Sequence, residues 1–391
     1  MSAADPRGCR APHGLDELAD TQLERFSRQI ALEGFGPEAQ LALLRSRVLV
    51  VGAGGLGAPV LTYLAAAGVG EVHVIDDDVV ERSNLHRQVI HGEDVLGRPK
   101  TASAAARMRA LHPELRVVEH RERLTAQNAL ELVRAVDLVV DGTDTFATRY
   151  LVADACEILG VPVVWGAILR FSGQVSVFHA GHGPVYRDLF PEPPEPGDVP
   201  TCAQAGVLGV LPGIIGTLMA AEAIKHLAGV GGTLLGRLLT VDALTMRFTT
   251  LALAPDPDRS PVTSLDAHRA ARGDVGGAAP SAGEAVSAAA LARALAEPGG
   301  DVVVVDVRED WERRLGAIEG SVHVPLGAIE RDPAAGLARA GDGEPARWVL
   351  HCAAGVRSAK ARDLILAARP ELTGRVLSLS GGYAAWEREG D

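Results

Sequence analysis

The chain has 391 residues, of which 47% are hydrophobic and 23% charged, and its formal net charge is −12. This length predicts two globular domains, and the acidic balance argues against nucleic acid or an anionic membrane as the main partner. The longest apolar run, residues 207–223, is interrupted by Gly, Pro and Thr and reads as a buried helix too short to span a membrane. No signal-peptide core follows the first residues, so we expect a cytoplasmic protein.

Helix and strand patterns alternate along residues 15–254. A polar tail over residues 1–14 is predicted to be disordered. Helices are expected over 15–32, 37–46, 100–111, 126–134 and 147–159, and strands over 48–51, 71–76, 116–120, 137–144 and 161–167. Further strand-like segments occupy 238–244 and 247–253. This alternation predicts an α/β domain with a Rossmann-like, mostly parallel sheet that is covered on both faces.

Residues 255–284 are rich in Pro, Gly, Ala, Asp and Ser, a composition typical of a flexible linker. Beyond them the alternation resumes over residues 285–391, with strands expected at 302–309, 323–326, 348–352 and 375–382. We therefore expect a second, smaller α/β domain after the linker.

A glycine-rich turn follows the first buried strand and opens a helix, with Gly52, Gly54, Gly55 and Gly57 as its glycines. Such glycines permit a tight turn and let backbone N–H groups approach a phosphate at a helix N-terminus. Asp76 ends the next strand, where a carboxylate that binds ribose belongs. Taken alone, this pattern indicates a nucleotide and fits NAD and ATP equally well.

Polar residues after the second strand favour ATP. Asn84, Arg87 and Lys100 could stabilise the negative charge of a triphosphate whose pyrophosphate leaves. Basic residues are usually solvated surface groups, but Lys100 is one of only three lysines in the chain. Asp144 lies just past a buried strand, at the sheet edge where ligands bind, and could either hold Mg²⁺ or cap the following helix.

Six segments occur in the order and spacing of the ubiquitin-activating-enzyme superfamily: RFSRQI, GAGGLG, DDDVVERSNLHRQ, GRPK, DGTDTFATR and GQVSVF. Over residues 20–253 they most resemble its bacterial adenylyltransferases, the MoeB/ThiF family. The resemblance implies that Asp76 binds the ribose of ATP, that Asp144 holds Mg²⁺, and that the phosphates are bound by Asn84, Arg87 and Lys100. It also implies a homodimer in which Arg28 reaches the active site of the other protomer.

The sequence departs from this family in two places. Thr145 stands where the family usually has Asn after the aspartate. Many relatives also carry two CxxC pairs for a structural zinc ion, whereas this chain has Val185, Asp188, Ser260 and Thr263 at those positions. Because tetrahedral structural zinc needs such ligands, we expect no zinc site.

The second domain contains a cysteine at a strand-to-helix turn. Cys352 begins the segment CAAGVRS, in which inward backbone N–H groups and a helix N-terminus favour a thiolate and Arg357 adds positive charge. A buried structural cysteine is the alternative. With DVRE upstream and LSGGYAAW downstream, this pattern resembles a single-domain rhodanese, a family whose loop cysteine carries a persulfide. The shorter spacing from Cys to Arg disfavours a phosphatase.

The sequence therefore predicts an ATP-dependent enzyme that resembles the MoeZ-type fusions of these two families. We expect it to adenylate the C-terminal carboxylate of a ubiquitin-like sulfur carrier and to add persulfide sulfur taken from thiosulfate or a cysteine desulfurase. Cys202 matches the superfamily cysteine that forms a thioester; here it could form one, release the product by disulfide exchange, or be a bystander. An NAD-dependent oxidoreductase and a non-catalytic scaffold are the alternative functions.

Overall fold

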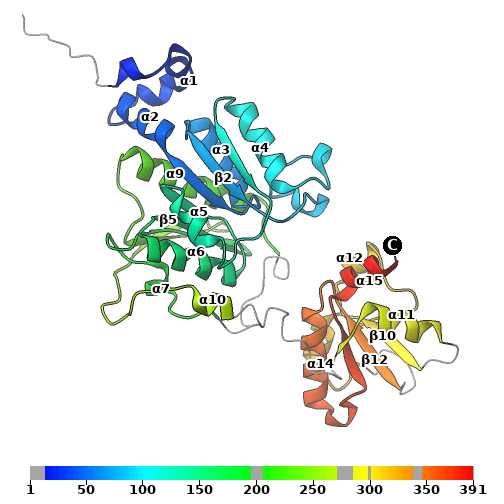
Figure 1. The fold of residues 1–391 in the computed structure, drawn as a ribbon. Helices are drawn as coiled ribbons and strands as arrows, with labels where there is room; N and C mark the ends of the chain where they lie inside the picture. The colour runs from blue at the N-terminus through cyan, green and yellow to red at the C-terminus, as the bar shows by residue number, and fades with distance from the viewer. Residues whose placement is uncertain (1–13, 195–205, 271–284, 298–300, 338–345, 391) are drawn as a thin grey trace, which may run out of the picture. The chain divides into compact units, whose positions relative to one another are not determined.

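The computed structural model describes residues 14–194, 206–270, 285–297, 301–337 and 346–390 (Figure 1). The chain divides into two compact units, residues 1–271 and 272–391. This boundary falls inside the stretch 255–284 that the sequence predicts to be a linker. Each unit has its own sheet and its own hydrophobic core, as is usual for separate domains.

The first unit is built on one eight-stranded sheet, in the order β3-β2-β1-β4-β5-β6-β7-β8. Its strands are β1 (Arg47–Val51), β2 (Glu71–Ile75), β3 (Arg116–His120), β4 (Leu138–Asp141), β5 (Val163–Leu169), β6 (Ser172–Phe178), β7 (Arg237–Asp242) and β8 (Arg247–Ala252). The pairings from β3 to β5 are parallel, and those from β5 to β8 are antiparallel. The predicted Rossmann-like, mostly parallel sheet is confirmed.

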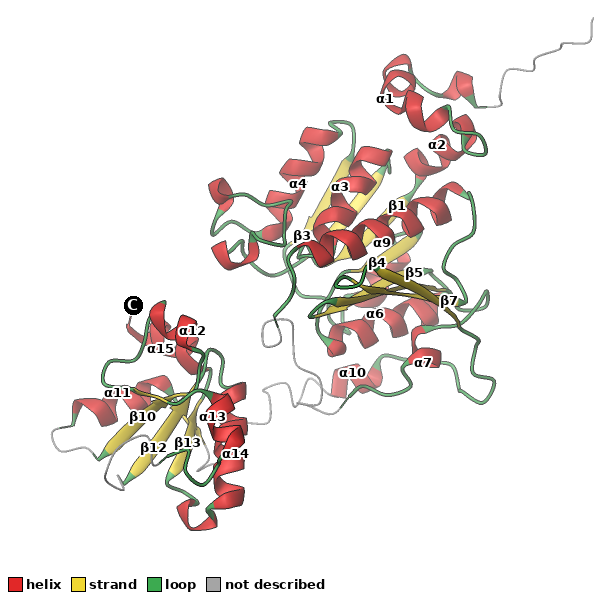
Figure 2. Ribbon diagram, turned by 180° about the vertical axis from the view of Figure 1, so that it is seen from behind, coloured by secondary structure: helices red, strands yellow, loops and turns green. Residues whose placement is uncertain are grey.

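Helices cover both faces of this sheet (Figure 2). One face carries α3 (Gly57–Ala67), α4 (Lys100–Leu111) and α9 (Val210–Ala228), and the other carries α5 (Ala129–Arg134) and α6 (Phe146–Leu159). Strand β1 explains the arrangement, because Val48 and Val50 pack on the α3 face while Leu49 and Val51 pack on the α6 face. The other α-helices in the described part of this unit are α1 (Asp20–Ile30), α2 (Gly36–Arg45), α7 (Tyr186–Leu189) and α10 (Asp266–Ala270).

Helix α9 is the most apolar long helix among the described residues. By length and composition alone it could cross a membrane, which differs from the expectation that no segment is long enough. Its residues Leu211, Ile215, Met219 and Ala223 are completely buried and join the core cluster that contains α3 and β1. The core helix of a globular domain has the same length and composition, and this packing favours that role.

The second unit contains a five-stranded parallel sheet, in the order β11-β10-β12-β13-β9. Its strands are β9 (Ala285–Val286), β10 (Val302–Asp306), β11 (Val322–His323), β12 (Arg347–His351) and β13 (Val376–Leu379). Its helices are α11 (Ala288–Ala296), α12 (Asp310–Arg314), α13 (Leu326–Arg331), α14 (Val356–Ala368) and α15 (Gly382–Gly390). The predicted smaller α/β domain is confirmed.

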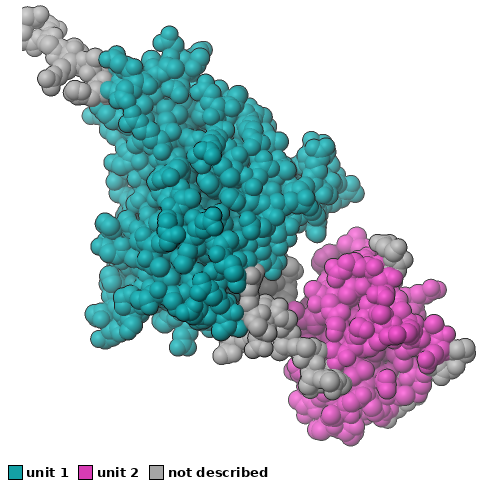
Figure 3. Space-filling view, in the orientation of Figure 1, with its two compact units in different colours: residues 1–271 teal, residues 272–391 magenta. Residues whose placement is uncertain are grey.

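Residues 255–270 pack on the first unit, although their composition predicts a linker; Figure 3 shows this unit in teal. The Arg259 guanidinium contacts Glu157 and Asp188, each at 2.8 Å. Leu265 is fully buried in the core cluster that contains residues of α5 and α6. The His268 ring also lies 2.6 Å from Asp154, so several contacts attach a segment that is otherwise rich in Pro and Asp. Of the predicted linker, residues 271–284 lie outside the described part of the chain.

Replacing Arg259 should destabilise the first unit. We expect Arg259→Ala to lower its free energy of unfolding by roughly 3 kcal/mol, because Glu157 and Asp188, only 6% and 4% exposed, lose their cation. The exposed Arg107 on α4 provides a control, since Arg107→Ala should change the free energy by less than about 0.5 kcal/mol. Hydrogen exchange of α6 peptides in increasing urea reports this unit separately. Equal stability of the two variants would contradict the packing role of residues 255–270.

Candidate active sites

The glycine loop between β1 and α3 is closed by direct backbone contact. A Cβ at Gly57 would lie 1.9 Å from the Gly52 carbonyl oxygen, and a Cβ at Gly55 would lie 3.0 Å from a proline ring of α9. Gly52 has a φ of +91°, in the left-handed region that favours glycine. A Cβ at Gly54 would meet only the Gln88 side chain, at an ordinary 3.6 Å. The fold therefore requires glycine at positions 52 and 57, leaves little room beside Gly55, and does not require glycine at position 54.

The predicted ribose-binding carboxylate lies against this loop. Asp76 follows β2 and accepts hydrogen bonds from the backbone N–H groups of Ala53 and Asp78, each at 2.8 Å. Ala53 is part of the glycine loop, so the two contacts fix the carboxylate beside the N-terminal end of α3. Both elements of the predicted nucleotide site thus meet at the carboxyl edge of the parallel strands.

Lys100 reaches the same edge from the first turn of α4. Its side chain is only 7% exposed, and Nζ lies 2.8 Å from the Asp78 carboxylate. The interpretation of Lys100 as a solvated surface residue is therefore wrong. Carboxylate oxygens of Asp76, Asp77 and Asp78 lie within 4.8 Å of one another, and Lys100 offsets part of their charge.

The segment between β2 and α4 also places polar groups near the loop. Asn84 is buried and its amide oxygen accepts a backbone N–H of the same turn at 3.3 Å. Arg87 is half-buried, and its Cγ would lie 3.7 Å from a Cβ at Gly55. Gln88, which the sequence reasoning missed, is buried beside Gly54, and its amide oxygen has no hydrogen-bond partner within the described residues. The only signal for Gln88 is its place at the end of the segment SNLHRQ.

Asp144 is exposed just beyond β4. The alternative role as a helix cap is taken by Thr145, whose hydroxyl accepts the Thr148 N–H at 3.4 Å at the start of α6. The carbonyl of Gly142 would lie 3.3 Å from a Cβ at Gly52, so the end of β4 touches the glycine loop. An exposed carboxylate at this edge fits Mg²⁺, which proteins usually hold with one or two carboxylates and substrate phosphates.

The described residues do not bring Arg28 into contact with the groups above. Arg28 is exposed on α1, and its guanidinium has no hydrogen-bond or ion-pair partner within the described residues. Cys202 lies outside the described residues. Cys156, in contrast, is buried on α6, where burial raises the pKa of its thiol, in agreement with a core role.

Cys352 lies between β12 and α14 and is 2% exposed. Its sulfur accepts a hydrogen bond from the Gly355 N–H at 3.1 Å, and the Ser358 hydroxyl lies 3.7 Å away. Gly355 has a φ of +98°, which allows the loop to turn toward the sulfur. The burial of the thiol alone would fit a structural cysteine. However, the loop N–H that donates to the sulfur can also stabilise a thiolate, as a reactive cysteine needs.

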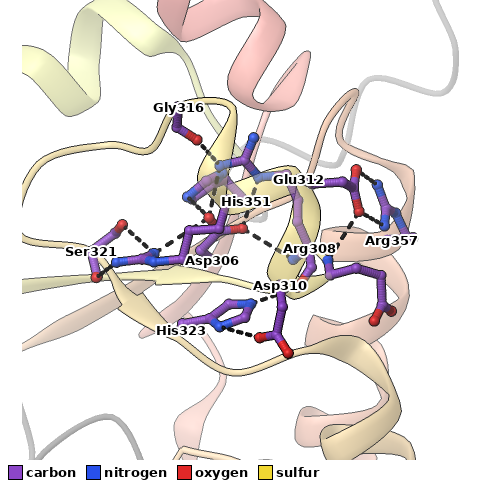
Figure 4. Close-up of polar contacts among 11 residues, drawn as sticks. Asp306, Arg308, Asp310, Glu312, Gly316, Ser321, His323, His351 and Arg357 are labelled. Atoms are coloured by element: carbon purple, nitrogen blue, oxygen red, sulfur yellow. Dashed lines mark hydrogen bonds and ion pairs between the residues drawn. The ribbon is translucent and has the colours of Figure 1, made fainter.

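Arg357 is paired with an acidic residue that the sequence reasoning missed. Its guanidinium donates to both carboxylate oxygens of Glu312, each at 2.6 Å (Figure 4). These hydrogen bonds raise the pKa of Arg357. Burial alone would raise the pKa of Glu312, but the arginine lowers it overall. The positive charge that the sequence assigns to the loop is therefore neutralised. The only sequence signal for this contact is the place of Glu312 at the end of the segment DVREDWE.

The DVRE motif forms a buried network next to the cysteine loop (Figure 4). Asp306 is fully buried and accepts two hydrogen bonds from Arg308, at 2.9 and 2.8 Å. The His351 ring lies 3.7 Å from the same carboxylate, and burial lowers the pKa of His351 to about 4. This histidine immediately precedes Cys352 and stays neutral at pH 7, and its ring nitrogens have no hydrogen-bond partner within the described residues.

Comparisons with known proteins agree with both halves of this description. Residues 26–262 match the ThiF family, and residues 287–389 match the rhodanese-like domain. The chain is 43% identical over 378 residues to the "probable adenylyltransferase/sulfurtransferase MoeZ" of Mycobacterium tuberculosis, covering 95% of this chain and 94% of that protein. It is 39% identical to the pig adenylyltransferase and sulfurtransferase MOCS3, covering 96% and 87%.

Further relatives match one unit. The sulfur carrier protein adenylyltransferase of Thermus thermophilus is 54% identical over 246 residues, covering 62% of this chain and 90% of that protein. Among solved structures, E. coli MccB with AMPCPP and MccA has a TM-score of 0.57 at 21% identity, covering 65% of this chain and 77% of that chain. At this identity the structural likeness supports the fold alone.

The chain belongs to the ThiF family and carries a C-terminal rhodanese-like domain. It is an enzyme that combines adenylyltransferase and sulfurtransferase activities, and its ThiF domain uses ATP. The recognition of both families from sequence, and the predicted class of enzyme, are confirmed.

Two glycine substitutions should separate folding from nucleotide binding. Gly57→Ala should lower the melting temperature by about 5–10 °C, because the new Cβ collides with the Gly52 carbonyl. Gly54→Ala has room in the loop and should keep the melting temperature, yet weaken ATP binding roughly tenfold, because its methyl group blocks close approach of a phosphate to the backbone. Thermal melting and calorimetric titration with ATP measure the two effects. The same loss of melting temperature in both variants would contradict this division.

Proposed function

We propose that the enzyme activates the C-terminal carboxylate of a ubiquitin-like sulfur carrier with ATP and then transfers sulfur to it from Cys352. One observation carries this proposal: a single chain joins a glycine loop flanked by Asp76 and Lys100 to a loop that binds the Cys352 thiol. A carboxylate must be activated before sulfur can replace its oxygen, so the two sites have complementary chemistry. The relatives named sulfur carrier protein adenylyltransferase and SAMP-activating enzyme E1 support a carrier protein as the substrate.

In the first step, a carboxylate oxygen of the carrier attacks the α-phosphorus of ATP. A mixed anhydride with AMP forms, and pyrophosphate leaves with the electron pair of the broken P–O bond. Asp76 binds the ribose hydroxyls, while Asn84, Arg87 and Lys100 stabilise the charge that develops on the phosphates. Asp144 would hold Mg²⁺, which supplies further neutralisation of phosphate charge. Lys100 must exchange part of its contact with Asp78 for phosphate.

In the second step, the terminal sulfur of a persulfide on Cys352 attacks the acyl carbon and AMP leaves. The carrier is then joined to Cys352 through an acyl disulfide. We favour a role for Cys202 in release: its thiolate attacks the Cys352 sulfur, the thiocarboxylate leaves, and a disulfide between the two cysteines remains for an external thiol to reduce. The alternative is a thioester between Cys202 and the carrier.

The proposal includes a homodimer in the cytoplasm, in which Arg28 of one protomer contacts the phosphates bound by the other. The exposure of Arg28 and its lack of a partner among the described residues support this role. Thiosulfate or a cysteine desulfurase supplies the sulfur. The absence of structural zinc also remains a prediction, which metal analysis of the purified protein tests.

The two alternative functions have less support. The relatives that match nearly the whole chain are named adenylyltransferases and sulfurtransferases, which disfavours an oxidoreductase that uses NAD at the glycine loop. A non-catalytic scaffold would not need the Cys352 thiol to be held by a loop N–H, nor Lys100 to be buried at the nucleotide edge. Exchange of pyrophosphate into ATP separates the adenylyltransferase from both alternatives, and a change in NAD(P)H absorbance with no response to ATP would favour the oxidoreductase.

The two chemistries should be separable by single substitutions. Cys352→Ala should keep carrier-dependent exchange of pyrophosphate into ATP and lose thiocarboxylate formation, because adenylation needs only the first unit. Asp144→Ala should show the reverse pattern: no exchange, but normal persulfide loading of Cys352 as read by mass spectrometry. Loss of both activities in either well-folded variant would be incompatible with this division of labour.

Mixed dimers test the role of Arg28. Arg28→Ala and Lys100→Ala homodimers should each be inactive in pyrophosphate exchange. After subunit mixing, heterodimers contain one complete site, so up to about a quarter of the wild-type activity should return when half of the dimers are mixed. Native mass spectrometry of the same sample establishes that subunits have exchanged. If they have and no activity returns, Arg28 does not act in the partner's site.

A further inference from the structure

The Cys352 loop contains one cation, and a carboxylate from another element neutralises it. Arg357 binds both oxygens of Glu312 on α12 (Figure 4). The two side chains are 22% and 11% exposed, so water screens their attraction only partly. An anion that approaches Cys352 therefore meets no unpaired positive side chain within this loop.

A second hydrogen bond fixes the Glu312 carboxylate of this ion pair. Glu312 also accepts the backbone N–H of Glu309 at 3.0 Å, which closes a capping box at the start of α12. If Arg357 turned toward an anion at Cys352, the shielded Glu312 carboxylate would lose its cation, and this loss is costly. The pairing is therefore the stable arrangement.

Several cations on neighbouring elements are paired as well, whereas Arg314 of α12 is exposed and has no ion-pair partner within the described residues. Arg308 and Arg313 bind the buried Asp306, and Lys360 of α14 binds Glu330. Trp311, next to Glu312 on α12, and Leu315, just after the end of this helix, are exposed and apolar. These surroundings suit a neutral or macromolecular sulfur donor better than a small dianion.

We propose that Glu312 sets the choice of sulfur donor, so that Cys352 takes sulfur from a persulfide of a thiol and discriminates against thiosulfate. The inference deepens the proposed function, on which it rests, because it selects one of the two donor classes. Glu312 does not touch Cys352 and acts through Arg357, so it is a positioning residue.

The charges of the two donors explain the discrimination. With thiosulfate, the Cys352 thiolate attacks the outer sulfur, the S–S bond breaks, and sulfite leaves with the electron pair. With a persulfide R–S–SH, the same thiolate attacks the terminal sulfur, and R–S⁻ leaves with the electron pair and takes the proton. Both reactions produce the Cys352 persulfide. Thiosulfate, however, brings two negative charges into a loop whose guanidinium is already paired.

The variant Glu312→Gln tests the proposal, because it keeps the size of the side chain and an oxygen for the α12 cap while it removes the charge. We expect kcat/KM for loading Cys352 from thiosulfate to rise roughly tenfold, mainly through a lower KM, since Arg357 becomes free to bind the dianion. Loading from cysteine persulfide should change less than about twofold. The gain with thiosulfate should shrink as salt concentration rises.

Two controls make the result specific. Glu330→Gln removes the same charge from an exposed ion pair with Lys360 and should leave both donors unchanged. The double variant Glu312→Gln, Arg357→Gln should lose the gain with thiosulfate. An unchanged rate with thiosulfate, or an equal rise with both donors, would overturn the role of Glu312. If wild-type Cys352 took up sulfur from neither donor, both this proposal and the sulfur-transfer step of the proposed function would be wrong.

Discussion

The turn between β1 and α3 closes only because position 57 has no side chain. The backbone of Gly52 occupies the place that a Cβ would need, and this contact brings the start of α3 to the carboxyl end of the parallel strands. Asp76 is fixed by a hydrogen bond to that same turn, and β4 ends against it at Gly142. The Asp76 carboxylate and the end of β4 therefore depend on one close approach of two backbone segments.

Paired charges organise both units of this acidic chain. Lys100 meets Asp78 at the nucleotide edge, and Arg357 meets Glu312 beside the cysteine loop. Arg259 contacts Asp188 and lies next to Ser260, so it joins the two segments in which the resembling family places zinc ligands.

The features that could be predicted from the sequence are those that short contiguous patterns encode. Buried parallel strands appear as apolar runs, and the glycine turn and the cysteine loop are contiguous motifs, so the fold and the centres of both sites could be predicted. The partners of Lys100, Arg259 and Arg357 could not, because each is a contact between residues that are far apart in sequence. For the same reason, the composition of residues 255–270 predicted a linker although Leu265 belongs to a core.

The attachment of residues 255–270 to the first unit has a consequence for how such chains are assembled in evolution. A recombination event that joined a sulfurtransferase module at residue 254 would separate Arg259 and Leu265 from the core that they complete. Only a junction after α10 preserves an intact first module. We therefore expect that a different second module could be joined only within a window that begins near residue 271, where the two compact units divide.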